Sequence, residues 1–534
     1  MDETQYPGTK EIIAQQRFRR NLFTALFVAL FSLIVGLMVA LTYLAPNAPE
    51  QRILLIGLIF AAGLMLPILI WNFPRAGLFM VFIGTTLFDV QPAALNGQKL
   101  TASVPFFLNF NNIGEYYGIP ALEPIKFSPA ELIILFTLLV WVVRTIVTRN
   151  WTFVRGPFLG VLLLFGLTTL MGLMHGFTAG GDFQIALWEV RPQFQPLIMY
   201  VITVNLVNER KHVVQMLWVA LIGIGTLGIV GVISYFQLHG NVTDQGILDH
   251  EDSLIVDAFI MVLVYLGVSK ANRNMTRIGV LLLPFVIFTL LENQRRAGIA
   301  SLIIALIISL PILFVMFEEK RKQIIRLIVV TALFMSVYLP AAWNAEGPWA
   351  LPARSIRSTT SPSDRDASSD VYRIMEDADL RYTRDTSPLI GYGYGKAFIQ
   401  VQPLPAVTTY FLSFFAHDSV LWLWMSTGHI GFFVFLFFVA TVFIKGLQIC
   451  RQVRDPILIS AGLMGITFLL MAYIYGKYDL QLTNVRTMTM VGIWLGLLGV
   501  IPELTKNKQA AEAKRDEQDP LLLDVPAFMV EDIH

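Results

Sequence analysis

The sequence predicts an all-α protein, a polytopic membrane helix bundle of about 12–14 transmembrane helices with one large non-cytoplasmic loop. Two observations carry this prediction. Hydrophobic residues make up 55% of the 534 residues and charged residues only 14%, and the mean hydropathy of +0.63 lies above the range of soluble globular domains. In addition, apolar stretches of about 20 residues, long enough to cross a bilayer as a helix, recur along the chain.

The apolar stretches fall into two series. The first comprises residues 22–44, 53–71, 76–90, 129–147, 157–175 and 192–207. The second comprises residues 213–237, 253–269, 277–292, 297–317, 324–343, 430–446, 456–475 and 484–502. Arg17, Arg19 and Arg20 precede the first stretch, which has spanning length and no clear small-residue cleavage site, so we expect it to remain as an anchor.

Lysine and arginine gather in alternate connections between these stretches, as the positive-inside rule expects of cytoplasmic loops. The basic connections lie at 75, 144–155, 209–211, 270–277, 318–326 and 445–454. This alternation predicts that both termini are cytoplasmic. The chain then divides into a cytoplasmic N-terminus, transmembrane helices with short loops, a large periplasmic or extracellular loop, a site-bearing segment with the last helices, and a polar cytoplasmic tail, at 1–21, 22–343, 344–416, 417–502 and 503–534.

Charge and cysteine content argue against several other classes of protein. A net charge of +1 gives no overall field that would attract nucleic acid. The single cysteine, Cys450, cannot form an intramolecular disulfide. No Cys–His or His-Glu-x-x-His spacing suggests a transition-metal site, and we expect neither a metal nor a cofactor.

Arg191, Arg295, Arg296 and His417 fall at helix ends on the side predicted to lie outside the cytoplasm. Ionisable groups at such depth are costly unless they are paired or functional. Arginine suits a diphosphate because its planar guanidinium donates two hydrogen bonds to phosphate oxygens and stays protonated. Histidine suits proton transfer, because its ordinary pKa of about 6.5 lets it accept a proton near neutrality.

Each of these residues also has a structural interpretation. Arg191 can be an interfacial residue paired with Glu189. One of the two arginines in the short turn at 292–298 can neutralise Glu292, which leaves the other for function. His417 alone can be an interfacial histidine before a helix.

Three further segments allow more than one interpretation. Gly391-Tyr-Gly-Tyr-Gly-Lys396 is similar to a phosphate-binding loop but lacks the preceding strand and the following Ser or Thr, so tight-turn glycines are favoured. The acidic run at 249–252 can bind a cation or act as a base, but a helix start is favoured. Within the large loop, the part from Ser355 to Asp364 has a linker composition, whereas the part from Tyr372 onward indicates a helix.

The order of motifs in the second half resembles the O-antigen ligase and polymerase family of integral-membrane glycan transferases. Pro388-Leu-Ile-Gly-Tyr-Gly393 ends the large loop, His417 follows, and Gly428 and Gly431 open the next span. The resemblance covers roughly residues 190–450. Arg296 with the following Ala and Gly is similar to the family's arginine before the large loop, with Arg295 as the alternative registration.

Arg191 is similar to a second family arginine further upstream. The chain departs from the family pattern at Asp418, where asparagine is usual, and in its larger number of helices. The family resemblance implies that Arg191 and Arg295 or Arg296 bind a diphosphate, and that His417, with Asp418 beside it, is the catalytic base.

The resemblance therefore implies a metal-independent inverting glycosyltransferase without a cofactor, multi-pass in a bacterial inner membrane, with its active site on the periplasmic or extracellular face. Its donor would be a polyprenyl-diphosphate-linked glycan held in membrane lipid, and its acceptor a glycan or lipid-core hydroxyl. The alternative is a polysaccharide or lipid transporter or flippase. Transport would require charged groups near the middle of the helices, whereas here they gather at one face.

Overall fold

All regular structure in the described part of the chain is helical, which confirms the all-α prediction. The computed structural model describes residues 49–90, 104–149, 152–240, 246–345, 347–358, 364–404 and 413–518, and isolated positions at 26, 29–30, 32–34, 36–37, 101, 242 and 361. The chain forms two compact units, one of residues 1–152 with 236–238 and the other of the remaining residues.

From Pro49 onward, the described residues of the first unit form the apolar helices α2 (Pro49–Asn72), α3 (Pro74–Leu87) and α6 (Pro129–Val147). The short helix α5 (Phe110–Tyr117) and the turn η2 (Pro120–Leu122) lie between α3 and α6. Ser128 begins α6 with a capping box, because its Oγ accepts the Glu131 N–H at 3.2 Å and the Glu131 carboxylate accepts the Ser128 N–H at 2.8 Å. This exchange satisfies two donors that a helix start otherwise leaves open.

The second unit contains the other long helices. They are α7 (Leu159–Thr178), α8 (Phe183–Leu206), α9 (Arg210–Gln237), α10 (His250–Ser269), α11 (Arg273–Glu292), α12 (Arg296–Met316), α13 (Arg321–Ala342), α14 (Leu351–Arg357), α15 (Asp364–Thr386), α16 (Ser419–Gln452), α17 (Pro456–Gly476) and α18 (Val485–Gln518). Short 3₁₀ turns are η3 (Glu318–Lys320), η4 (Pro348–Ala350) and η6 (Gln481–Thr483).

Ten helices in the described residues are long and apolar enough to cross a membrane, and the chain is a multi-span membrane protein. The expected stretches from 53–71 to 484–502 each fall on a helix. The stretch at 22–44 lies largely outside the described residues. Three helices that carry expected stretches are not among the ten: α2 and α3, whose described apolar parts are short, and α8, which contains Glu189 and Arg191.

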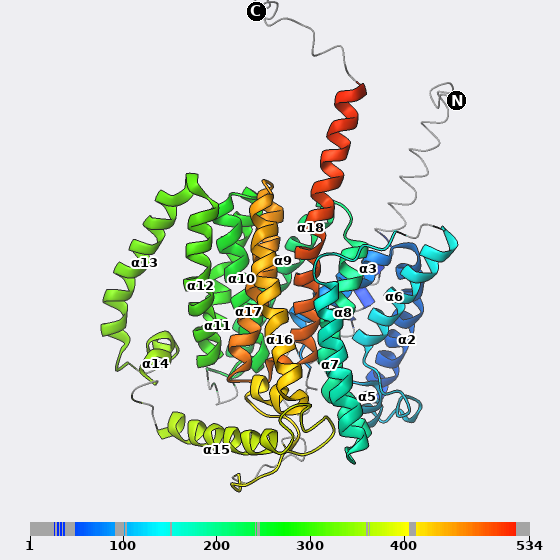
Figure 1. Ribbon diagram of the computed structural model, residues 1–534, viewed down its shortest axis with the longest axis vertical. Helices are drawn as coiled ribbons and strands as arrows, with labels where there is room; N and C mark the ends of the chain where they lie inside the picture. The colour runs from blue at the N-terminus through cyan, green and yellow to red at the C-terminus, as the bar shows by residue number, and fades with distance from the viewer. Residues whose placement is uncertain are drawn as a thin grey trace, which may run out of the picture. The chain divides into compact units, whose positions relative to one another are not determined.

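The core of the second unit forms around α8, α10, α17 and α18. Within the spanning windows 89% of α18 and 83% of α17 are buried, against 6% of α13, which lies at the edge of the bundle (Figure 1). Small residues allow the close contact of α18 with α8, since Gly492 meets Pro196 and Gly496 meets Thr203, as is usual where membrane helices associate. The apolar face of α13 is suited to lipid.

Helix α15 lies across one end of this bundle (Figure 1), and we call this the α15 end. Helices α10, α12, α16 and α18 begin there and α11 and α17 end there, whereas the basic connections at 207–210, 270–273, 317–321 and 453–455 lie at the opposite end. This segregation follows the pattern of alternate basic loops. Which end faces the cytoplasm stays a prediction.

Two segments are more helical than the sequence indicated. The linker-like stretch from Ser355 contains the end of α14, and α15 begins at Asp364, before the helix expected from Tyr372 onward. Helix α18 continues from the membrane span through the polar residues to Gln518. Charged residues such as lysine, glutamate and arginine are good helix formers, so a polar tail that follows a spanning helix can extend it.

Candidate functional site

The glycine-rich segment after α15 packs against a break in α16. Gly428 has φ of 68° and ψ of −171° inside that helix, which frees backbone donors from the helical pattern. The N–H groups of His429 and Ile430 donate instead to the carbonyl oxygens of Pro388 and Leu389, at 2.7 and 3.2 Å. The segment that resembles the family motif therefore fixes the path of the chain between α15 and α16.

Gly428 is expected to be intolerant of a side chain. Its φ is positive, and a Cβ there would clash with the backbone of Leu389 and Gly391, so Gly428→Ala should cost about 2 kcal/mol or more. Gly160→Ala is the matched control, because a Cβ at Gly160 meets nothing within 4 Å. Thermal unfolding of the purified proteins checks this; equal melting temperatures for both variants would contradict it.

His417 lies immediately before α16 and is held by a buried carboxylate from α15. The backbone N–H of His417 donates to Oε2 of Glu376 at 2.9 Å, and Nδ1 lies 3.2 Å from both carboxylate oxygens. Glu376 is fully buried, whereas 28% of the His417 side chain is exposed. The Tyr372 ring packs edge-on against the imidazole, with centroids 5.5 Å apart. This pairing assigns the proton to Nδ1 and leaves Nε2 to act on a substrate.

The surroundings of His417 raise the pKa of its imidazole. Burial lowers this pKa, but the hydrogen bond to Glu376 and the charges of Glu376 and Asp479 outweigh burial, with Arg373 opposing them. Because the folded pKa exceeds the unfolded value of about 6.5, the pairing stabilises the fold fully below that value. Its contribution is lost as the pH rises through the folded pKa.

Asp418 caps α16 and takes part in an ion pair. Its Oδ1 accepts the Leu421 N–H at 2.9 Å, and its Oδ2 binds Nζ of Lys477, which follows α17. Lys477 also lies 3.3 Å from Asp377 of α15. Burial by itself lowers the pKa of Lys477. The hydrogen bonds and charges of the two carboxylates outweigh burial, so the pKa of Lys477 lies above its ordinary value. Since both oxygens of Asp418 are engaged, its contacts favour a positioning role over direct proton transfer.

The two arginines of the short turn lie at the α15 end. Arg295 is the N-cap residue of α12 and interacts electrostatically with Tyr475. Arg296 begins α12, and its Nη2 lies 3.4 Å from Oδ1 of Asp370 on α15. Arg373, one turn further along α15, lies 3.8 Å from the same oxygen. The structure therefore brings Arg296 toward the helix that carries the partner of His417.

The prediction that Arg191 lies at a helix end is wrong, because α8 begins at Phe183 and Arg191 lies half-buried more than two turns inside it. Two residues earlier, the Glu189 carboxylate accepts the N–H of Gly395. Two residues later, Gln193 donates to the Leu482 carbonyl at 2.7 Å. Glu189 and Gln193 share one face of α8, and Arg191, two residues from each, lies on another face, so its proposed role toward a diphosphate stays a prediction.

A second histidine–carboxylate pair, which the sequence did not indicate, lies near His417. Nδ1 of His250 at the start of α10 is 3.0 Å from Oδ2 of Asp479, and the charge of Asp479 also acts on His417. Burial raises the pKa of Asp479, but the charge and hydrogen bond of His250, with other contacts, hold it at about 2. The Asp479 carboxylate therefore stays ionised near the two imidazoles.

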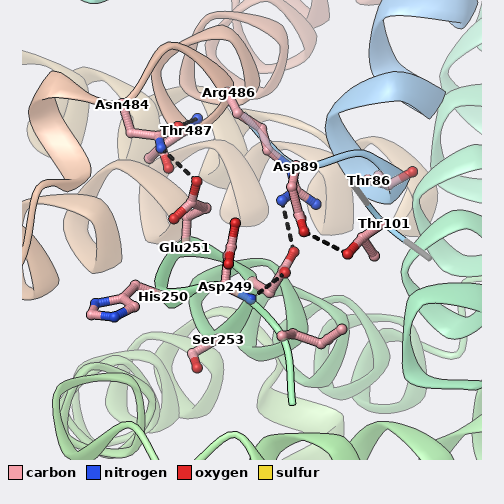
Figure 2. A network of polar contacts seen from close by, with 12 residues as sticks. Thr86, Asp89, Thr101, Asp249, His250, Glu251, Ser253, Asn484, Arg486 and Thr487 are labelled. Carbon is pink, nitrogen blue, oxygen red and sulfur yellow. Dashed lines mark hydrogen bonds and ion pairs between the residues drawn. The ribbon is translucent and has the colours of Figure 1, made fainter. Parts of the chain in front are cut away.

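The acidic run at 249–252 starts α10 and belongs to a buried polar network (Figure 2). Oδ1 of Asp252 lies 2.7 Å from Nη1 of Arg486, with both side chains fully buried. The other Asp252 oxygen accepts the Asp249 N–H at 3.1 Å, and Asn484 donates to Glu251 at 2.8 Å. This geometry agrees with a helix start. Among the described residues no group of three or more His, Cys, Asp or Glu side chains is placed to hold a metal ion.

Comparison with protein-family models and with curated proteins found no match for this chain. The fold and the candidate site together define a multi-span membrane protein with a histidine–glutamate pair and several arginines at one end of its helix bundle. The likeness to glycan transferases depends on the motifs in the sequence alone.

Proposed function

We propose that this protein is a membrane glycosyltransferase that moves a glycan from a polyprenyl diphosphate to a hydroxyl group of a glycan or lipid-core acceptor. The observation that carries the proposal is the placement of His417, with Nδ1 on buried Glu376 and a partly exposed ring, at the end of the bundle where Arg295 and Arg296 begin α12. A base and cations at one end of a membrane bundle suit a lipid-linked phosphate donor.

The reaction needs one proton acceptor and stabilisation of one leaving group. The acceptor oxygen forms a bond to the anomeric carbon while its proton passes to Nε2 of His417. The bond from that carbon to the diphosphate oxygen breaks, its electron pair leaves with the diphosphate, and the configuration inverts. Arg296, or Arg295 in its place, with Arg191, offsets the negative charge that builds up on the leaving group. Since the diphosphate already activates the sugar, fixed cations can replace a metal and a nucleotide.

Glu376 acts in this reaction as a positioning residue. A carboxylate on Nδ1 fixes the tautomer in which Nε2 accepts a proton and stabilises the imidazolium that forms. The same carboxylate raises the pKa of His417, which makes the imidazole a stronger base. Two contacts hold the Glu376 carboxylate in place, because it accepts hydrogen bonds from the backbone N–H and from the ring Nδ1–H of His417.

Reconstitution tests the proposal directly. Purified protein in liposomes should convert a polyprenyl-diphosphate-linked glycan and an acceptor glycan into elongated acceptor and free polyprenyl diphosphate.

The transporter alternative depends on Asp257, a fully buried carboxylate inside α10 that accepts a hydrogen bond from Ser301 at 3.1 Å, since a buried charge within a span can mark a transport path. Movement of intact donor between leaflets without transfer would overturn the enzymatic proposal.

Glu376→Gln should change the pH profile of transfer as well as its rate. Activity requires unprotonated His417, and removing the carboxylate lowers the pKa of His417, so the acid limb of the profile should move to lower pH. The rate above that limb should fall, by less than the about 10²- to 10⁴-fold that loss of a general base costs. Glu318→Gln, which removes an exposed partner of Arg321 at the opposite end, is the control. An unchanged acid limb would remove Glu376 from the mechanism.

A further inference from the structure

Two arginines from different segments meet on one carboxylate oxygen at the α15 end. Nη2 of Arg296 lies 3.4 Å and Nη1 of Arg373 lies 3.8 Å from Oδ1 of Asp370. Both distances exceed the about 2.7–2.9 Å of a well-formed charge-assisted hydrogen bond. The Asp370 carboxylate therefore holds both guanidinium groups nearby without a close hydrogen bond to either of them.

This arrangement has unused capacity to bind a larger anion. Nε of Arg373 is buried and makes no hydrogen bond to any residue that the structure describes, and a buried donor without a partner costs free energy. The side chains of Arg296, Arg373 and Asp370 are 22%, 35% and 41% exposed, so a ligand can reach them.

The point where the arginines meet lies beside the candidate base. Tyr372 precedes Arg373 on α15 and packs its ring against His417, and the charge of Arg373 acts on the same imidazole. An anion bound between Arg296 and Arg373 would therefore lie close to His417. This is where the reaction proposed above places its leaving group.

We propose that Arg296 and Arg373 form a subsite for a phosphate group of the lipid-linked donor, and that the Asp370 carboxylate fills this subsite in the ligand-free protein. The inference rests on the proposed function and adds Arg373, on the large loop, to the donor site. A phosphate presents several oxygens and more charge than a carboxylate, so it engages two guanidinium groups better. On donor binding the Asp370 side chain turns to solvent and its place is taken by the phosphate.

Binding measurements on the full-length protein in nanodiscs test the subsite, with inorganic pyrophosphate and farnesyl diphosphate as probes. Arg373→Gln should weaken binding of both probes by about 10-fold or more, and Arg373→Lys should restore only part of it, because lysine lacks the planar fork. Asp370→Asn should tighten binding several-fold by removing the internal competitor. Asp385→Asn is the matched control, since it breaks a similar pair with Arg384 on the same helix and should change neither affinity.

The outcomes separate the possible sources of the phosphate. Competition by phosphatidylglycerol in the nanodisc, as strong as by farnesyl diphosphate, would assign the subsite to a phospholipid headgroup and overturn the donor assignment. Unchanged or weaker binding in Asp370→Asn would overturn the proposal that Asp370 is a competitor. Transfer activity with unaltered probe affinity in Arg373→Gln would reject the subsite alone, whereas intact probe binding without any transfer would reject the proposed function and leave the subsite standing.

Discussion

Replacing His417 by alanine is expected to abolish glycan transfer. His417 is the residue on which the motif, the position at the α15 end and the chemistry agree, because its Nδ1 is fixed by buried Glu376 and its ring is partly exposed. Loss of a general base commonly costs about 10²- to 10⁴-fold in rate. The measurement is glycan transfer by purified protein in liposomes, alongside thermal unfolding and donor binding.

A second variant separates the base from the structural role of the ring. His417→Ala leaves the fully buried Glu376 without its imidazole partner, and this alone lowers stability. His417→Asn keeps an N–H that can reach the carboxylate but offers no nitrogen that accepts a proton. It should fold and bind donor like the parent yet remain inactive. A folded His417→Asn protein that retains most transfer activity would remove His417 from the mechanism.

The helices could be predicted because the signal for a membrane span is local. About 20 consecutive apolar residues suffice to identify a span, and each expected stretch in the described residues falls on a helix. The helix that positions Glu376 was harder to predict in detail. From the sequence, the charges of α15 fit a solvated face as well as a site, because local composition does not show which face of a helix is covered.

The members of the site could be predicted only in part for the same reason. His417 and Arg296 have recognisable motifs, whereas the partner of His417 lies 41 residues upstream, and Asp479 lies in a short turn that no motif marks. Arg373 belongs to the charges of the large loop that fit a cover over the site and a solvated helical face equally well, and no motif marks Asp370. Their meeting with Arg296 depends on α15 crossing the end of the bundle, which is a property of tertiary packing and of no single segment.

The buried pair of Asp252 and Arg486 shows the same limit. Asp252 could be predicted as part of a helix start, but Arg486 lies at the beginning of the last apolar stretch, 234 positions away along the chain, and nothing in its neighbours marks a carboxylate partner. The structure makes both side chains fully buried at 2.7 Å. Such a pair is costly to desolvate. Its effect on stability is therefore seen mainly when one partner is removed and the other charge stays buried without a counter-charge.

Arg486→Met is expected to destabilise the protein by about 3–5 kcal/mol, since breaking a buried ion pair leaves an uncompensated charge. The effect should be large here because the charge of Arg486 also acts on Glu251, so methionine leaves neighbouring carboxylates without their cation. Adding Asp252→Asn to Arg486→Met should recover part of the loss, because the amide removes the stranded charge. Thermal unfolding of the purified variants in nanodiscs measures both effects.

The control for this prediction is an exposed ion pair in the same unit. Arg210 binds Asp455 at the opposite end of the bundle, with 54% of the arginine side chain exposed, and exposed pairs contribute about 0–1 kcal/mol. Arg210→Gln should therefore lower the melting temperature far less than Arg486→Met. If the two variants melt alike, or if the double variant is no more stable than Arg486→Met alone, the pair of Asp252 and Arg486 does not hold α10 to α18 as its burial implies.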